Sequence, residues 1–133
     1  MALPPLPYDA SHAALGLALV VRFGSRVRGT ARPDSDLDLA VLRADGRRLT
    51  HRELGELMLV LADRYGARVD VVDLATADAL VRREVVQDGA VDHARDRDAW
   101  IDLVYRTLVD LDDLGPHLQA CIEGVARVAR GAV

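Results

Sequence analysis

The sequence predicts an α+β (α/β) fold, in which helices pack on a small β-sheet of at least three strands and a helical hairpin follows at the C-terminal end. Two observations support this. Three short runs rich in valine, leucine and alanine are bounded by turn-forming residues, as buried strands are. Between and after them, apolar residues recur at the spacing of helices that bury one face. A chain of 133 residues suits one domain with a single core.

The N-terminal part contains a short helix and the first strand. Residues 1–8 form a proline-rich lead-in that we expect to be loosely ordered. A helix is expected from Asp9 to Gly16 with Asp9 or Ser11 as its N-cap, because both side chains can accept hydrogen bonds from backbone N–H groups. Leu17 to Phe23 is apolar except for Arg22, which predicts a central strand.

The second strand follows a polar connection. Gly24 to Gly29 is predicted to be a turn or a single helical turn, and Asp36 to Leu42 is the predicted strand. The loop after it contains the turn-forming pair Asp45-Gly46.

A long helix comes next. Thr50 and Glu53 form a capping box that opens it, and Gly66 ends it. The residues predicted to face the core are Leu54, Leu57, Met58, Leu61 and Tyr65.

The third strand is predicted in residues 67–74, whose sequence is ARVDVVDL. Thr76 is expected to cap a helix that runs through Gln87, with Gly89 just beyond its end.

The C-terminal hairpin is predicted from two helices, one near Ala99 to Leu114 and one ending near Arg130, separated by Gly115-Pro116. The buried stripe expected on the first of them is Ile101, Val104, Tyr105, Leu108 and Leu111. The single cysteine, Cys121, falls on the apolar face of the last helix and is expected to be a core residue.

The composition excludes several classes of protein. All 17 basic residues are arginine, which excludes lysine Schiff-base chemistry and a Walker A loop. A net charge of −4, an aromatic content of 4% and the lack of a basic recognition helix argue against direct DNA binding. No apolar stretch approaches the ~20 residues of a membrane span, and the first residues lack signal-peptide features. We therefore expect a cytoplasmic protein without membrane contact.

Two sets of polar residues are expected to be solvated rather than functional. The histidines lack metal-ligand spacing and are predicted to lie on the surface: His12, His51, His93 and His117. The predicted solvated face of the helix after Thr76 consists of Arg82, Arg83 and Glu84.

The pair Asp36 and Asp38 is unusual for a buried strand. Strand side chains alternate, so both carboxylates point to one face while Leu37, Leu39 and Val41 point to the other. A solvated edge strand would explain the pair without any function, because charge on an edge also prevents aggregation.

The neighbouring turn favours a functional explanation. Gly24-Ser25 ends the first strand ten residues before Asp36. A glycine lets backbone N–H groups approach an anion, and the serine hydroxyl and a helix N-terminus add donors. This phosphate cradle would lie beside carboxylates that suit Mg²⁺, a cation that prefers oxygen ligands. The combination indicates a nucleoside triphosphate pocket.

A third carboxylate comes from the third strand. Strand alternation favours Asp70 as the one that joins the pair, whereas Asp73 lies on the opposite face and is expected to cap or solvate the strand exit. Two unit charges at ~4 Å repel by about 4 kcal/mol at an effective dielectric constant near 20, so such a cluster calls for a cation.

The joined pattern resembles a known family. Gly24-Ser25, ten residues and then Asp36-Leu37-Asp38 match the G-S-x10-D-x-D motif of minimal nucleotidyltransferases (MNT), in the DNA polymerase β-like superfamily. The wider string FGSRVRGTARPDSDLDLAV is similar to MntA-type antitoxins of HEPN/MNT toxin–antitoxin pairs. The resemblance covers about Leu17 to Gly89. It departs at VDHARD, where many relatives carry a segment similar to LYERD.

The resemblance implies a nucleotidyltransferase fold with a mixed sheet, a single domain over 1–133, a catalytic core over 9–89 and C-terminal helices over 98–133. It also implies that the carboxylates of Asp36, Asp38 and Asp70 bind two Mg²⁺ ions. Gly24, Ser25 and the neighbouring backbone would hold the β- and γ-phosphates of ATP.

The implied reaction is in-line attack of an acceptor hydroxyl on the α-phosphate with release of pyrophosphate, and Asp70 would be the general base or a metal ligand. The implied acceptor is a tyrosine of a HEPN ribonuclease toxin, which the transferred AMP would silence.

Alternatives remain open. Arg26, Arg28 and Arg32 could grip the triphosphate or the acceptor, or form a solvated loop. The chain could instead transfer a nucleotide to a small molecule such as an aminoglycoside, although the residues after Gly89 are few for an acceptor domain. A third possibility is an antitoxin that acts by binding alone.

Overall fold

The computed structural model of the chain describes residues 6–29 and 36–111, without the side chains of Arg26 and Arg28. The predicted last helix, and with it Cys121 and His117, lies outside the described residues, and so does Arg32.

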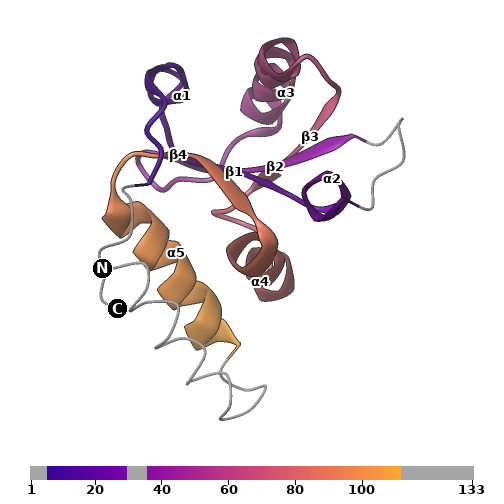
Figure 1. Cartoon of the computed structure of the whole chain (residues 1–133). Coiled ribbons are helices and arrows are strands. Elements are labelled where there is room, and N and C mark those ends of the chain that lie inside the picture. Colours follow the sequence, from indigo (N-terminus) through magenta and orange to yellow (C-terminus); the bar gives the residue numbers. More distant parts are fainter. Residues whose placement is uncertain (1–5, 30–35, 112–133) are drawn as a thin grey trace.

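The strands form a four-stranded sheet in the order β3-β2-β1-β4 (Figure 1). The strands are β1 (Leu17–Phe23), β2 (Leu37–Arg43), β3 (Val69–Asp73) and β4 (Ala90–Ala94). β1 pairs antiparallel with β2 and β4, and β2 pairs parallel with β3. The sheet is therefore mixed, as the resemblance implied, and β1 is central, as its apolar sequence predicted.

The fourth strand was not predicted. Its sequence AVDHA places Asp92 and His93 in the middle, so it shows neither a long apolar run nor a clean alternation. It pairs with the central strand β1 all the same. The sheet thus extends beyond Gly89, where the predicted core ended.

Five helices connect and cover the strands within the described residues: α1 (Ala10–Ala14), α2 (Ser25–Arg28), α3 (His51–Tyr65), α4 (Ala79–Asp88) and α5 (Arg97–Asp110). The capping box of Thr50 and Glu53 opens α3 as predicted, and Gly66 ends it in the left-handed conformation. Asp9 caps α1. The predicted cap of α4 was wrong: Asp78, not Thr76, accepts the hydrogen bond of the Val81 N–H at 2.9 Å.

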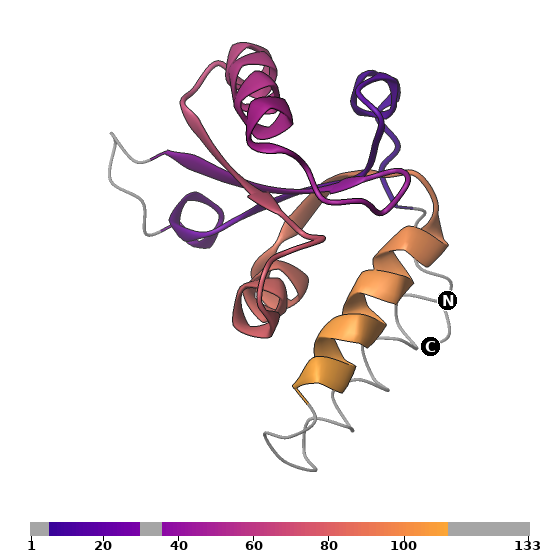
Figure 2. The same cartoon turned by 180° about the vertical axis from the view of Figure 1, so that it is seen from behind.

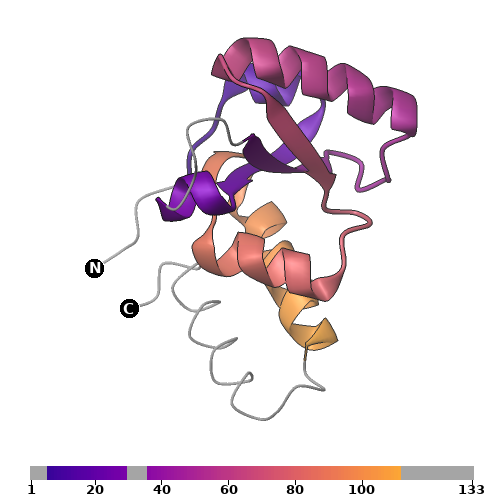
Figure 3. The same ribbon diagram turned by 90° about the vertical axis from the view of Figure 1, so that its right-hand side faces the viewer.

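The helices lie on both faces of the sheet. α1 and α3 cover one face, and α4 and α5 cover the other (Figures 1 and 2). The side view shows the same layers, with α3 on one side of the strands and α4 and α5 on the other (Figure 3). The two cores share the sheet: Leu37, Leu39 and Val41 of β2 pack with α3, and Ala40 packs with α4 and α5.

Two histidines predicted on the surface are buried. His12 is 1% exposed and His93 is 0% exposed. The ring of His93, on β4, is bonded to the Asp9 N–H at 2.9 Å and to the Leu17 carbonyl at 3.0 Å. The unpredicted strand β4 and the packing of α1 explain both errors. His51 is exposed, as predicted.

The helix faces also differ from prediction in detail. Arg82 is only 8% exposed, because α5 packs beside α4. Its Nη2 donates a hydrogen bond to Asp110 Oδ2 at 2.6 Å. Arg83 is exposed, as predicted. Tyr105 was expected in the buried stripe of α5, yet it is 50% exposed, and Leu103 is buried on that helix instead.

None of the helices in residues 6–29 and 36–111 has the length and apolar character needed to cross a membrane.

Candidate active site

The register of the parallel pair β2–β3 brings the predicted carboxylates onto one face. Asp38 and Asp70 are direct cross-strand partners, and Leu37 is the partner of Val69. Leu37 and Val69 belong to the core beneath α3, so Asp38 and Asp70 point to the face that carries α4 and α5. Alternation places Asp36, which immediately precedes β2, on that face as well. The register thus places Asp38 and Asp70 on one face, and alternation extends that face to Asp36.

The Asp38 carboxylate lies against the glycine turn at the end of β1. Gly24 has a φ of +83°, and a Cβ added there would lie 2.2 Å from Asp38 Oδ2. A side chain at this position would therefore be both strained and in collision with the carboxylate. Asp38 is also the cross-strand partner of Phe23, the residue before the turn. The candidate phosphate cradle and the candidate metal ligand are thus in direct contact.

Ser25 opens α2, a single helical turn, which is one of the two forms predicted for this segment. A helix of this length has little macrodipole, so the donors at this turn are the individual backbone N–H groups and the serine hydroxyl. Arg26 and Arg28 lie on the same turn. Their backbone positions place them next to the cradle.

The three carboxylates differ in exposure and in contacts. Asp70 is exposed, and Asp36 and Asp38 are half-buried. Arg68 Nε donates a hydrogen bond to Asp36 Oδ1 at 3.0 Å, and Nη2 of the same guanidinium forms an ion pair with that oxygen at 3.0 Å. Among the described side chains, no group of three or more His, Cys, Asp or Glu residues is arranged to hold a metal ion. The carboxylates share a face but do not form a closed ligand set.

Asp73, the fourth aspartate of the region, has a structural role. It is 9% exposed, and its carboxylate accepts the N–H of Leu49 at 2.7 Å and that of Ala75 at 3.0 Å. These bonds tie the loop before α3 to the end of β3. Asp73 was expected to cap or solvate the strand exit; it caps the exit and is buried.

A charged network on the other face was not predicted. Arg22 Nε donates to both carboxylate oxygens of Asp92 at 2.9 Å, and the Tyr65 hydroxyl donates to Asp92 Oδ2 at 2.6 Å. Burial raises the pKa of Tyr65 well above its usual value, and the hydrogen bond to Asp92 is the second cause of this shift. The single charge of Arg22 within an apolar strand was the signal for a partner across the sheet. A cavity of about 520 Å³ adjoins this network and α2.

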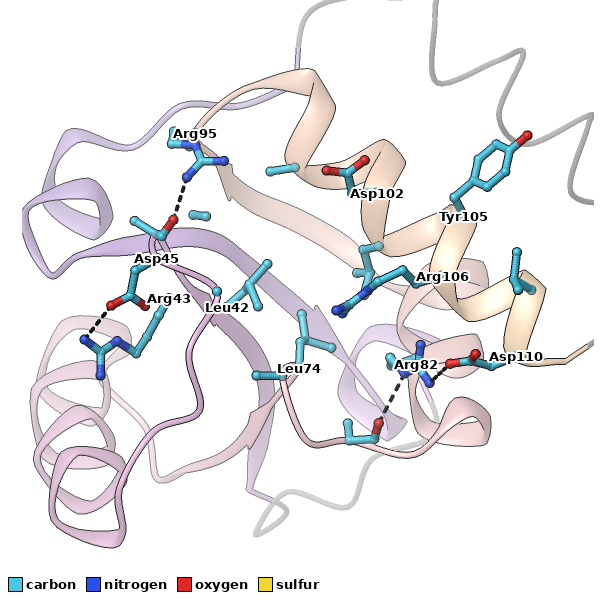
Figure 4. A pocket seen from close by; sticks show the side chains of 18 residues that line it. Leu42, Arg43, Asp45, Leu74, Arg82, Arg95, Asp102, Tyr105, Arg106 and Asp110 are labelled. Atoms are coloured by element: carbon cyan, nitrogen blue, oxygen red, sulfur yellow. Dashed lines mark hydrogen bonds and ion pairs between the residues drawn. The ribbon is translucent and has the colours of Figure 1, made fainter.

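A larger cavity, of about 810 Å³, opens at the opposite end of the strands (Figure 4). Leu42 and Leu74 line it from the sheet, and Arg106 points into it from α5 (Figure 4). Leu42 is four residues beyond Asp38 along β2, or ~13 Å at ~3.3 Å per residue. The cavity is therefore separate from the carboxylates.

The chain is similar to known nucleotidyltransferases. A family model described as polymerase β, nucleotidyltransferase, matches residues 14–98. The protein adenylyltransferase MntA of Shewanella oneidensis is 40% identical over 73 residues, which are 55% of this chain and 51% of that protein. The match thus spans about half the length of this curated relative.

Solved structures are similar over more of the chain. A crystal structure of a toxin–antitoxin with AMP-PNP is 31% identical, with a TM-score of 0.65, over 83% of this chain and 86% of the matched chain. A structure of the tri-AMPylated HEPN toxin of Shewanella oneidensis in complex with its MNT antitoxin is 26% identical, with a TM-score of 0.61, over 87% of this chain and 93% of the matched chain.

Proposed function

Because the chain belongs to the polymerase β nucleotidyltransferase family, we propose that it is a metal-dependent adenylyltransferase that acts as the antitoxin of a HEPN/MNT pair. It transfers AMP from ATP to a tyrosine hydroxyl of the HEPN ribonuclease toxin and thereby neutralises the toxin. The observation that carries the proposal is the contact between the Gly24 turn and Asp38, beside the Asp38–Asp70 pair. The adenylylated toxin in the complex of a relative supports the choice of acceptor.

The residues fit a divalent metal. Asp36, Asp38 and Asp70 offer carboxylate oxygens, the ligands that Mg²⁺ prefers; Asp70 is exposed, and Asp36 and Asp38 are half-buried. Gly24 lets the Asp38 carboxylate lie against the turn, where the Cβ of any other residue would collide with it. Bound Mg²⁺ would lower the pKa of the acceptor hydroxyl and neutralise charge on the phosphates.

The chain's own groups have separate tasks. The backbone N–H groups at Gly24 and the Ser25 hydroxyl hold the β- and γ-phosphates of ATP, and Arg26 and Arg28 add positive charge on the same turn. AMP-PNP in the complex of a relative supports ATP as the substrate. These contacts fix the triphosphate so that its α-phosphorus faces the carboxylates.

The transfer is a single displacement. The acceptor oxygen forms a bond to the α-phosphorus, the bond from that phosphorus to the oxygen bridging to the β-phosphate breaks, and pyrophosphate leaves. Asp70 either takes the phenolic proton or binds the metal on the acceptor side, in which case the proton passes to water. Its exposure makes Asp70 the carboxylate that an incoming protein side chain can reach.

Label transfer from ATP tests the proposed function. The protein is incubated with Mg²⁺, ATP labelled on the α-phosphate and the HEPN toxin encoded beside it. The wild type is expected to label the toxin, and Asp36→Asn and Asp38→Asn are each expected to lower the rate by at least about 100-fold. Asp45→Asn, in the exposed turn after β2, is the matched control and should keep the rate. Equal labelling by Asp38→Asn would refute the assignment. Neutralisation without any labelling would indicate an antitoxin that acts by binding alone.

A further inference from the structure

Arg68 occupies the fourth corner of the carboxylate cluster. Asp38 faces Asp70 across β2 and β3, and the Leu37 N–H donates to the Arg68 carbonyl at 2.9 Å. One step toward the start of both strands, Asp36 therefore lies beside Arg68. Alternation puts the Arg68 side chain on the same face as Asp70. Two neighbouring side-chain pairs therefore lie across β2 and β3: Asp38 with Asp70, and Asp36 with Arg68.

The guanidinium is directed at the outer carboxylate. Its Nε and Nη2 both lie 3.0 Å from Asp36 Oδ1. The Arg68 side chain is 85% exposed and that of Asp36 is 38% exposed. Because exposed ion pairs are weak, this contact can open at little cost.

We propose that Arg68 is the counterion of Asp36 in the metal-free protein and competes with the divalent metal for that carboxylate. This inference rests on the proposed function, since it takes Asp36 to be a metal ligand. Two physical effects act in the same direction. The ion pair must open before Asp36 can bind a metal, and the positive charge of Arg68 repels a cation that arrives at the neighbouring carboxylates. The positive charge of Arg68 offsets part of the negative charge of the three aspartates and thereby weakens metal binding.

A phosphate-binding role for Arg68 predicts the opposite result. An arginine that grips the triphosphate would strengthen the binding of metal and nucleotide together, and its removal would weaken it. The contact between Arg68 and Asp36 favours the first role, because the guanidinium already faces a carboxylate immediately before the strand that carries Asp38. The sign of the effect therefore separates the two roles.

The test is a titration of the protein with Mn²⁺ in the absence of nucleotide. Binding is measured by calorimetry and, independently, by the loss of the free-ion signal in electron paramagnetic resonance. Arg68→Gln keeps much of the side-chain length and removes the charge. Arg83→Gln, at an exposed position of α4, gives the same change in net charge on another element. Arg68→Gln is expected to bind Mn²⁺ about three- to tenfold more tightly than the wild type, and Arg83→Gln within about twofold of it.

The outcomes separate this inference from the proposed function. Binding by Arg68→Gln that equals that of Arg83→Gln, or is weaker than that of the wild type, overturns the role of Arg68. If the wild type binds Mn²⁺ and Asp38→Asn does not, the metal site stands whatever Arg68 does. If the wild type binds no Mn²⁺, the inference and the metal site both fail. Melting curves in EDTA confirm that each variant is folded.

Discussion

At the scale of single residues, Gly24 is required both by its backbone conformation and by the position of the Asp38 carboxylate. Its φ of +83° favours glycine, as does the φ of +74° at Gly46, but only Gly24 has a carboxylate 2.2 Å from the position of a Cβ. Gly46 has no atom within 4 Å of that position. The two glycines therefore separate the cost of a left-handed backbone from the cost of a collision with Asp38.

Gly24→Ala and Gly46→Ala use this difference. Each is expected to lower the free energy of unfolding by about 1 kcal/mol through backbone strain. Gly24→Ala should lose more and should also weaken the binding of a non-hydrolysable ATP analogue at least tenfold, because the methyl group displaces the Asp38 carboxylate. Urea denaturation and calorimetry measure the two effects. Unchanged nucleotide binding by Gly24→Ala would contradict the cradle.

His12 predicts a pH dependence of stability. Burial lowers its pKa below the usual value of 6.5, and the nearby Asp9 only partly opposes this. The unfolded chain then binds a proton at a pH where the folded protein does not, so stability is lost as the pH falls below 6.5. Asp9 does not change its protonation between pH 5 and pH 7.5, because its hydrogen bond with Ser11 lowers its pKa to about 2.

His12→Gln removes the titrating group. Between pH 7.5 and pH 5, the wild type is expected to lose more of its free energy of unfolding than the variant does. Urea denaturation at the two pH values provides the comparison. The same loss in both proteins would show that His12 does not carry the effect.

At the scale of the elements, Asp73 joins the end of β3 to the loop before α3. Asp73→Ala leaves the N–H groups of Leu49 and Ala75 without their acceptor. We expect a loss of about 2–4 kcal/mol in the free energy of unfolding. Asp73→Asn retains one carbonyl oxygen as an acceptor and should lose less. Thermal melts test the order, and a loss below about 0.5 kcal/mol for Asp73→Ala would contradict the role.

Most elements were predictable because their signals are local. The capping box of Thr50 and Glu53 and the apolar run of β1 lie within a few residues of sequence. The strand β4 was missed because its partner β1 is distant in the chain, and only that pairing makes a strand of a polar segment. The cap of α4 was misplaced because Thr76 instead belongs to the turn after β3, where its N–H donates to Asp73.

At the scale of the whole molecule, strand alternation was enough to predict which carboxylates share a face. It could not predict how β2 and β3 align, and that register makes Asp38 the partner of Asp70 and puts Arg68 beside Asp36. The burial of His12 and His93 likewise depends on how α1, β1 and β4 meet. The periodicity of a sequence predicts which side chains of one element share a face. It does not predict which residues of two separate elements lie beside each other.

The most direct test of the account compares two aspartates of one strand in single-turnover transfer of labelled AMP to the HEPN toxin. Asp70 lies on the carboxylate face and Asp73 lies under the loop before α3, so Asp70→Asn and Asp73→Asn make the same chemical change on opposite faces. Measured well below both melting temperatures, Asp70→Asn is expected to lower the rate by at least about 100-fold and Asp73→Asn by less than about threefold. Equal rates for the two variants, or a greater loss for Asp73→Asn, would contradict the assignment of the active face.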